Sequence, residues 1–222
     1  MADLENKQEH PYYSNPSPVP APAPAQQVIA NPGPLGLCGF ALTTFVLSLH
    51  NAGAGVAATG PSNVVVGLAF FYGGLVQLLA GMWEFKTGNT FGATAFSSYG
   101  GFWLSFGLIF VPGAGILDAY TAKSTVQNLE NSLGIYLLGW TIFTGIMLIA
   151  SHRSNCGLVA LFFFLFITFI LLTASKFNAS TPLQVAGGAF GVVTAVIAWY
   201  NALSGLLTKE SSYFTLPTVP LH

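Results

Sequence analysis

Charged side chains are scarce in this sequence. Asp, Glu, Lys and Arg together make up 6% of the 222 residues, whereas hydrophobic residues make up 53%. The surface of a soluble domain carries roughly a quarter to a third of charged residues, so this composition excludes the soluble class. It predicts an all-α integral membrane protein that crosses the bilayer several times.

Basic residues and cysteines are also few. The 6 Lys and Arg residues and the formal net charge of -1 supply no basic patch that neutralises a run of phosphates, so nucleic acid is excluded as a partner. The two cysteines, Cys38 and Cys156, have no metal-ligand spacing to a histidine and are predicted to be free thiols. No set of nucleophile, base and metal ligands is visible, so we expect no cofactor, no metal and no enzyme.

The first thirty residues lack hydrophobic periodicity. They are polar and contain a run of Pro and Ala over residues 16–25, which is typical of a disordered or polyproline-like segment. We therefore expect a disordered cytoplasmic tail over residues 1–30, a transmembrane transporter domain over residues 31–207, and a short cytoplasmic tail over residues 208–222.

Long apolar runs fill most of the remaining chain. A spanning helix needs about 20 largely apolar residues, and short connections between such helices favour antiparallel neighbours in one bundle. The six windows that meet or nearly meet this length are residues 35–54, 64–84, 90–111, 132–151, 157–175 and 185–207. The connection over residues 112–131 is expected to be a loop.

The few basic residues predict the orientation. With both termini in the cytoplasm, four basic residues lie inside and two outside, as the positive-inside rule favours. The inside residues are Lys7, Lys86, Arg153 and Lys209, and the outside residues are Lys123 and Lys176.

Ionisable residues are absent from the middle of every predicted span, so a fixed charge within the membrane is not expected to drive transport. Hydroxyl and amide side chains occur there instead at helical spacing. One stripe comprises Thr44, Ser48 and Asn51, and another comprises Thr94, Ser97, Ser98, Gly101 and Ser105. Together they favour a polar pathway, although hydrogen bonds within a helix or between helices explain any single side chain better.

Gly187 and Gly191 form a G-x-x-x-G that predicts close packing, within a protomer or between protomers.

Two motifs place helix starts at one membrane face. In the run Asn31-Pro32-Gly33-Pro34-Leu35-Gly36-Leu37, proline is tolerated because the N–H groups of a first helical turn are unpaired in any case. Asn31 is a natural cap there, and Asn89 or Thr90 caps the third span in the run Gly88-Asn89-Thr90-Phe91-Gly92. Free N–H groups and the positive end of the helix dipole suit a small carboxylate, although capping alone also explains these residues.

These motifs resemble those of the acetate uptake transporter family, which contains bacterial acetate/succinate permeases and fungal acetate permeases, some of the latter linked to ammonium export. The resemblance also rests on Phe-Tyr-Gly-Gly at 71–74, Gln77 and Ser-Tyr-Gly at 98–100, and it extends from Asn31 to about Leu207. It implies six transmembrane helices, a homohexamer and one path through each protomer. The Pro-rich tail is similar to that of fungal members, which implies the plasma membrane. Gly33 stands where the family usually has Ala, so we expect altered kinetics without loss of function.

The resemblance further implies a constriction near mid-membrane formed by Phe40, Tyr99 and Leu165. Ordinary core packing is the alternative for all three residues. In a path for a small monocarboxylate, Tyr99 is expected to hydrogen-bond the carboxyl group while Phe40 and Leu165 contact the methyl group and exclude water. Because a buried unpaired charge is costly, we expect passage as acetic acid or as acetate with a proton.

Further residues are expected along the path. They are Asn31, Pro32, Gly33, Pro34, Leu35, Gly36, Leu37, Thr44, Tyr72, Gln77, Glu84, Asn89, Thr90 and Thr94. Glu84 has two interpretations: a tether of the following turn through Lys86, which we favour, or a proton relay at the mouth.

Two other functions remain open. An ammonium or ammonia exporter would use aromatic rings, such as Phe70, Phe71 and Tyr72, to face a cation. A receptor or regulator that transports nothing would signal through the amino-terminal tail. The expected partners are therefore acetate or another short-chain carboxylate, the lipid bilayer, and further copies of the chain.

Overall fold

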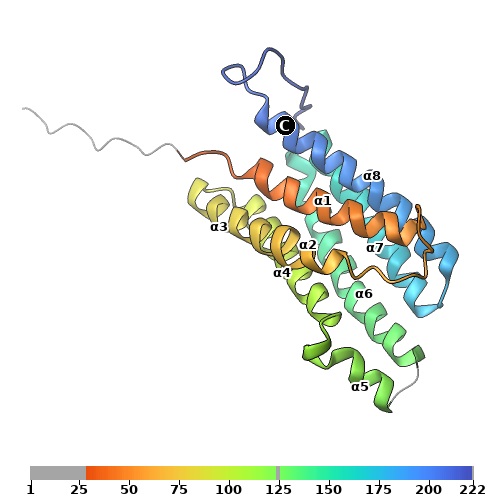
Figure 1. Cartoon of the computed structure of the whole chain (residues 1–222). Helices are drawn as coiled ribbons and strands as arrows, with labels where there is room; N and C mark the ends of the chain where they lie inside the picture. Colours follow the sequence, from red (N-terminus) through yellow and green to blue (C-terminus); the bar gives the residue numbers. More distant parts are fainter. Residues whose placement is uncertain (1–28, 124–125, 222) are drawn as a thin grey trace, which may run out of the picture.

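The computed structural model describes residues 29–123 and 126–221, and these residues form a bundle of long helices (Figure 1). The predicted tail over residues 1–30 lies outside the described residues except for its last two. The helices are α1 (Gly33–Ala52), α2 (Val65–Phe70), the π-helix η1 (Phe71–Val76), α3 (Gln77–Thr87), α4 (Thr90–Ile109), the 3-10 turn η2 (Pro112–Ala114), α5 (Ile116–Lys123), α6 (Val126–Ala150), the 3-10 turn η3 (Ser151–Arg153), α7 (Cys156–Phe177) and α8 (Thr181–Leu206).

Local sequence signals set the helix ends. At the start of α1 the Gly33 N–H donates to Asn31 Oδ1 at 2.9 Å, and α1 ends before Gly53, which has a φ of 75° that favours glycine. Asn89 caps α4 by accepting a hydrogen bond from the Gly92 N–H at 3.0 Å. Asn155 caps α7 in the same way, with Leu158 N–H at 2.9 Å. The predicted cap at Asn89 is thus confirmed, whereas the cap position of α1 is Pro32, one residue after the predicted Asn31, whose side chain accepts the Gly33 N–H from just before the helix.

The second apolar window contains a π-helical turn. Segments α2, η1 and α3 continue one another over residues 65–87, and the Phe-Tyr-Gly-Gly sequence forms the wide turn. A Cβ atom on Gly39 of α1 would lie 2.8 Å from the Tyr72 carbonyl oxygen. Glycine therefore lets α1 approach the π turn closely. Such turns are often found at functional sites.

The predicted loop over residues 112–131 is wrong. Residues 116–123 form α5, and α6 begins at Val126 instead of near residue 132. These residues lack the apolar run of a span, but the Gln127 amide donates to Asn131 Oδ1 at 2.9 Å, one turn along the helix. Local helical bonds therefore extend α6 beyond its apolar part. Figure 1 places α5 at the opposite end of the bundle from the C-terminal segment.

Five helical segments in the described part of the chain are long and apolar enough to cross a membrane: residues 33–52, 65–87, 126–153, 156–177 and 181–206. The remaining predicted window forms α4, which has a similar length of 20 residues. Its glycines, serines and threonines lower its hydropathy, so composition alone does not mark α4 as a span.

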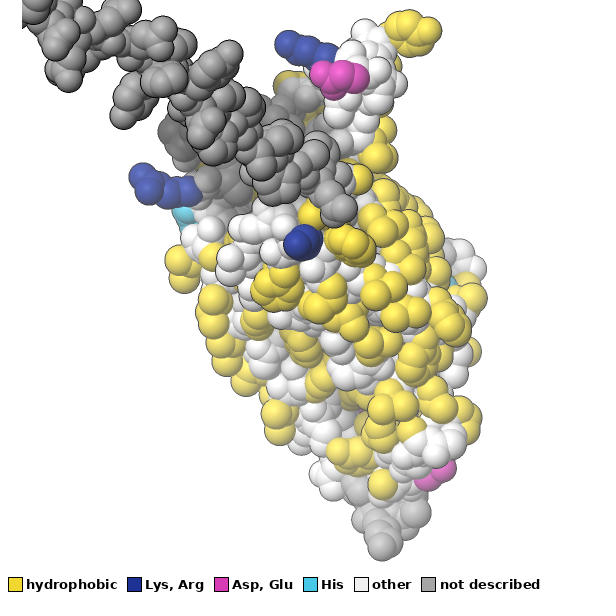
Figure 2. Space-filling model, turned by 90° about the vertical axis from the view of Figure 1, so that its left-hand side faces the viewer, with side chains coloured by type: hydrophobic (Ala, Val, Ile, Leu, Met, Phe, Trp, Pro, Cys, Tyr) yellow, Lys and Arg dark blue, Asp and Glu magenta, His cyan; other side chains and the backbone are white. Residues whose placement is uncertain are grey.

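Apolar side chains also cover the outside of the bundle. Ile142, Ile146 and Ile149 of α6 are 60%, 58% and 74% exposed. In Figure 2 yellow hydrophobic side chains cover the middle of the visible face, and the charged side chains lie toward its ends. An apolar belt between polar ends is the surface expected of a protein in a bilayer.

The G-x-x-x-G of α8 packs inside the protomer. A Cβ atom on Gly187 would lie 2.8 Å from Leu172 of α7, and Gly191 abuts the Ser48 hydroxyl of α1. Gly188, which is not part of the motif, lies against the α1 backbone, where its Cβ atom would be 2.7 Å from the Ser48 carbonyl oxygen. These glycines therefore seat α8 between α1 and α7.

The C-terminal segment lies across the turn between α6 and α7. The Cys156 N–H donates to the Val219 carbonyl oxygen at 2.9 Å, and the Leu221 N–H donates to the Ser154 carbonyl oxygen at 3.1 Å. Residues beyond α8 are thus held at the end of the bundle where α7 begins.

Candidate functional site

A cavity of about 150 Å³ opens where α1 and α4 begin and where α3 ends. We call it the first cavity. Residues of α1, α3, α4 and α7 surround it. It brings together these predicted site residues: Asn31, Gly33, Leu37, Phe40, Gln77, Glu84, Asn89, Tyr99 and Leu165. An engineered apolar cavity of about the same volume accommodates benzene, so this space suits a molecule of a few heavy atoms.

Other predicted site residues do not line the first cavity. They are Pro32, Pro34, Leu35, Gly36, Thr44, Tyr72, Thr90 and Thr94. Thr90 and Thr94 are exposed on the outside of α4, whereas Phe96 and Tyr99 are buried. Successive residues turn by about 100° around a helix, so the cavity-facing side of α4 excludes both threonines. The expected hydrogen bonds from Thr90 and Thr94 along the path are therefore not formed within this protomer.

Three buried side chains close the inner end of the first cavity. Phe40, Tyr99 and Leu165 are 5%, 3% and 3% exposed. The Phe40 and Tyr99 rings lie 5.9 Å apart between centroids. The three residues expected at the constriction therefore meet in one place, although they come from α1, α4 and α7.

The Tyr99 hydroxyl already has a partner that sequence reasoning missed. It shares a hydrogen bond of 2.9 Å with Thr144 Oγ1 of α6, and Thr144 is fully buried. The Tyr99 ring also packs against Trp140, Phe143 and Phe162. Two threonines, Thr141 and Thr144, stand three positions apart in an otherwise apolar helix, and this pattern could have indicated a buried polar contact from α6. The phenol is thus held in place by α6, and its oxygen retains capacity for a second hydrogen bond.

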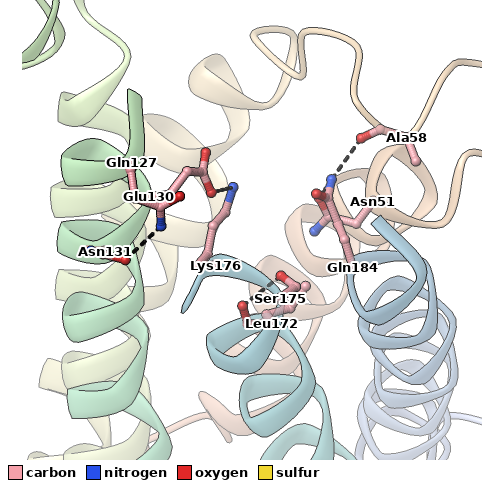
Figure 3. A network of polar contacts seen from close by, with 9 residues as sticks. All are labelled: Asn51, Ala58, Gln127, Glu130, Asn131, Leu172, Ser175, Lys176 and Gln184. Atoms are coloured by element: carbon pink, nitrogen blue, oxygen red, sulfur yellow. Dashed lines mark hydrogen bonds and ion pairs between the residues drawn. The ribbon is translucent and has the colours of Figure 1, made fainter. Parts of the chain in front are cut away.

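A second, wider cavity of about 540 Å³ opens at the other end of the bundle. We call it the second cavity. It is lined by the end of α1 at His50 and Asn51, by Phe106 of α4, and by the α7 and α8 residues Lys176 and Gln184. Lys176 and Glu130 of α6 form an ion pair (Figure 3), whose nitrogen and oxygen atoms lie 2.9 Å apart. The Gln184 amide donates to the Ala58 carbonyl oxygen at 2.7 Å. This cavity thus contains an ion pair and amide groups among lining residues that are mostly apolar.

One helical turn of aromatic residues separates the two cavities. Phe102 follows Tyr99 on α4 and Phe169 follows Leu165 on α7, and both phenylalanines line the second cavity. Their rings make an edge contact with centroids 5.5 Å apart. The barrier therefore has two layers, and sequence reasoning found only the first.

Glu84 is a buried carboxylate at the first cavity. Its side chain is 3% exposed, and its Oε2 accepts hydrogen bonds from Asn89 Nδ2 at 2.9 Å and from Thr87 Oγ1 at 3.3 Å. Glu84 therefore tethers the turn between α3 and α4 as predicted, but through Asn89 and Thr87. The predicted partner Lys86 is wrong, because the ion pair found among residues 29–123 and 126–221 joins Lys176 to Glu130. The side chain turns inward to the amide of the α4 cap instead.

Four buried side-chain polar atoms have no hydrogen-bond partner in the described part of the chain, and two of them belong to predicted site residues. The Gln77 Oε1 atom accepts no hydrogen bond there although Gln77 is 1% exposed and lines the first cavity. The Thr44 hydroxyl on α1, one turn beyond Phe40, is likewise unpaired. Buried polar atoms normally have partners, so these two atoms mark the inner part of the first cavity and the level of the barrier.

Two blind cavities that enter an apolar helical bundle from opposite ends and stop at a shared aromatic barrier define a membrane transporter or channel. The sequence profile of the GPR1/FUN34/yaaH family matches residues 13–222, and the chain belongs to this family. The resemblance noted from the motifs is thereby confirmed.

Relatives and a solved structure agree with this assignment. The chain is 54% identical to ammonia transport outward protein 2 of Saccharomyces cerevisiae over 194 residues, which is 85% of this chain and 67% of that protein. It is 50% identical to acetate permease A of Emericella nidulans over 196 residues, 85% of this chain and 65% of the relative. The chain thus spans about two thirds of the length of these fungal relatives. The structure of the bacterial acetate channel SatP is similar with a TM-score of 0.72 at 34% identity, covering 86% of this chain and 99% of that one.

Proposed function

We propose that this chain is a membrane transporter or channel for acetate and other small monocarboxylates. The observation that supports this proposal most directly is the pair of cavities on opposite sides of one barrier. The first cavity ends at Phe40, Tyr99 and Leu165, and the second ends one helical turn farther on, at Phe102 and Phe169. The acetate permease and acetate channel among its relatives support this substrate class. The volume of the first cavity, about 150 Å³, favours acids with few carbon atoms.

The barrier favours passage with a proton. A bare carboxylate between Phe40 and Leu165 would lose its water without gaining a cation, because the polar groups that the described residues place at that level are neutral hydroxyls, those of Tyr99, Thr144 and Thr44. Transfer of an unpaired ion into such surroundings costs far more than transfer of a hydrogen-bonded neutral group. We therefore propose that the solute crosses as acetic acid, or as acetate accompanied by a proton.

The proposal extends to the topology and assembly. Helix α4 is taken as a sixth span, since its 20 residues match the other spans and its inner face lines the first cavity. We propose a homohexamer in the plasma membrane with one path in each protomer and both termini in the cytoplasm. Residues 1–30 and 208–222 are the two tails, and residues 31–207 form the transport domain. Lys86 and Arg153 at the first-cavity end support this orientation.

Ammonia export is a second candidate function. The name of the yeast relative, ammonia transport outward protein 2, favours it. Neutral ammonia is small enough for the same cavity, and the Tyr99 and Gln77 side chains offer hydrogen-bond partners. Release of labelled ammonia from loaded proteoliposomes at a rate above that of acetate uptake would make it the primary function.

Uptake of labelled acetate into proteoliposomes tests the proposed function. Initial rates are compared for the purified protein, protein-free liposomes and a Tyr99→Ala variant, each with and without an inward proton gradient. We expect uptake above the protein-free rate, loss of that excess in the variant, and acceleration by the gradient. A folded and correctly inserted protein that gives no excess rate would refute acetate transport.

A further inference from the structure

A single carboxylate occupies the place where a substrate carboxylate was expected. The N-terminal ends of α1 and α4 both face Glu84: a Cβ atom on Gly33 would lie 3.5 Å from its Oε1, and a Cβ atom on Gly92 would lie 3.0 Å from its carboxyl carbon. The amide of Asn89, the cap of α4, donates to the carboxylate at 2.9 Å. The positive ends of two helix dipoles thus act on Glu84.

No cation compensates this carboxylate within the described residues. The titratable side chains that line the first cavity from α1, α3, α4 and α7 are Glu84 and Tyr99. The Lys86 side chain, two residues farther along α3, is exposed on the surface of the bundle and does not line the cavity. A substrate carboxylate that enters the first cavity therefore meets a like charge while Glu84 is ionised, and it meets an O–H donor when Glu84 is protonated.

Gln77 provides an independent indication of a neutral solute. It lies on the same face of α3 as Glu84, two turns deeper in the cavity, and its amide oxygen accepts no hydrogen bond from a described residue. An amide pairs with a neutral carboxylic acid through both its oxygen and its N–H group. A carboxylate has only acceptors, so it would leave the amide oxygen unpaired.

We propose that Glu84 is the proton-binding carboxyl group of the path and that its protonation admits the substrate carboxylate to the first cavity. The inference rests on the proposed function. A proton from the aqueous mouth binds a Glu84 carboxylate oxygen, and the O–H then donates to an oxygen of the incoming carboxylate. Transfer of this proton forms the new O–H bond of the neutral acid and regenerates the Glu84 carboxylate. Gln77 then accepts a hydrogen bond from the neutral acid, which carries the proton across the barrier.

The test compares Glu84→Gln with two matched variants in proteoliposomes. Glu84→Asp keeps the carboxyl group, and Glu130→Gln makes the same chemical change in the second cavity. The measured quantity is the ratio of initial acetate uptake with and without an inward proton gradient, after subtraction of the protein-free rate. Glu84→Gln has no proton to give to the incoming carboxylate, so we expect it to lose most of the excess uptake and its ratio to fall to about one, because acetate without a proton crosses the barrier slowly. The ratio should remain near the wild-type value in Glu130→Gln and be partly restored in Glu84→Asp.

A wild-type ratio in Glu84→Gln would overturn the inference while acetate transport itself stands. Absence of wild-type uptake would instead refute the proposed function. If Glu84→Gln does not fold, infrared difference spectra of the wild-type protein with isotope-labelled acetate test the inference instead. The carbonyl band of a protonated protein carboxyl group should change when acetate binds, and this band should be shifted in Glu84→Asp. No acetate-dependent protein carboxyl band would overturn the inference.

Discussion

The two cavities differ in size and in the charged groups that line them. The first has a volume of about 150 Å³ and ends on buried aromatic and aliphatic side chains, whereas the second has about 540 Å³ and contains the Lys176–Glu130 ion pair. A charged group in the wide cavity keeps part of its hydration, because both partners of the ion pair are about a quarter exposed. We therefore expect the solute to lose its water in the first cavity and at the barrier. Selection of the solute should take place there as well.

Loss of the Tyr99 hydroxyl should produce the largest change in uptake. In Tyr99→Phe the ring contacts remain, but the buried Thr144 hydroxyl loses its partner. We expect uptake to fall about tenfold, equivalent to about 1.4 kcal/mol in the barrier, with a stability cost of about 1 kcal/mol. Initial uptake rates and thermal unfolding measure the two effects. Tyr136→Phe is the matched control, since the Tyr136 hydroxyl bonds Ser105 beside the second cavity at 2.8 Å, and it should leave uptake nearly unchanged.

Truncation of Phe40 should change selectivity more than the overall rate. Phe40→Ala enlarges the inner end of the first cavity, so uptake of four-carbon and longer acids should rise relative to acetate. The lost packing should cost about 3–5 kcal/mol. Competition of unlabelled acids with labelled acetate measures the preference, with Phe106→Ala in the second cavity as control. A variant that only lowers the amount of folded protein, with unchanged preference, would refute the role of Phe40 in the constriction.

Removal of the α4 cap should have a moderate effect. Asn89→Ala deletes the acceptor for the Gly92 N–H and the donor to Glu84. Loss of a cap costs about 1 kcal/mol, and the freed carboxylate should also slow acetate uptake. Ser180→Ala removes the cap of α8 beside the second cavity. It should lower the unfolding temperature without slowing uptake, and equal slowing by both variants would argue against a special role for the first cavity.

Disruption of the second-cavity ion pair should have the smallest effect. The Lys176 and Glu130 side chains are 26% and 25% exposed, so solvent screens their attraction. Lys176→Ala should reduce stability by less than about 1 kcal/mol, and the difference should shrink at high salt. Thermal unfolding and uptake at two ionic strengths test this. A large loss of uptake would instead indicate that the second cavity contributes to selection of the solute.

Most helix positions were predictable because they depend on local sequence. Apolar runs located α1, α7 and α8 within a few residues, and Asn89 and Asn155 cap helices through their own nearby backbone. The prediction failed over residues 112–131, where the amide pair Gln127 and Asn131 supports a helix that hydropathy does not reveal. The candidate site was predicted less completely. Thr94 was selected by spacing, although the cavity lies on the opposite face of α4.

The sequence by itself determined that this is an apolar helical membrane protein, where most of its long helices begin, and to which family it belongs. These properties depend on composition, on capping within a few residues, and on ordered motifs. Only the tertiary structure decided which face of each helix lines a cavity and that Thr144 holds the Tyr99 hydroxyl. It also placed Glu84 between the starts of α1 and α4. Such contacts join residues far apart in the chain, and they depend on how glycine-lined helices pack, which no local pattern encodes.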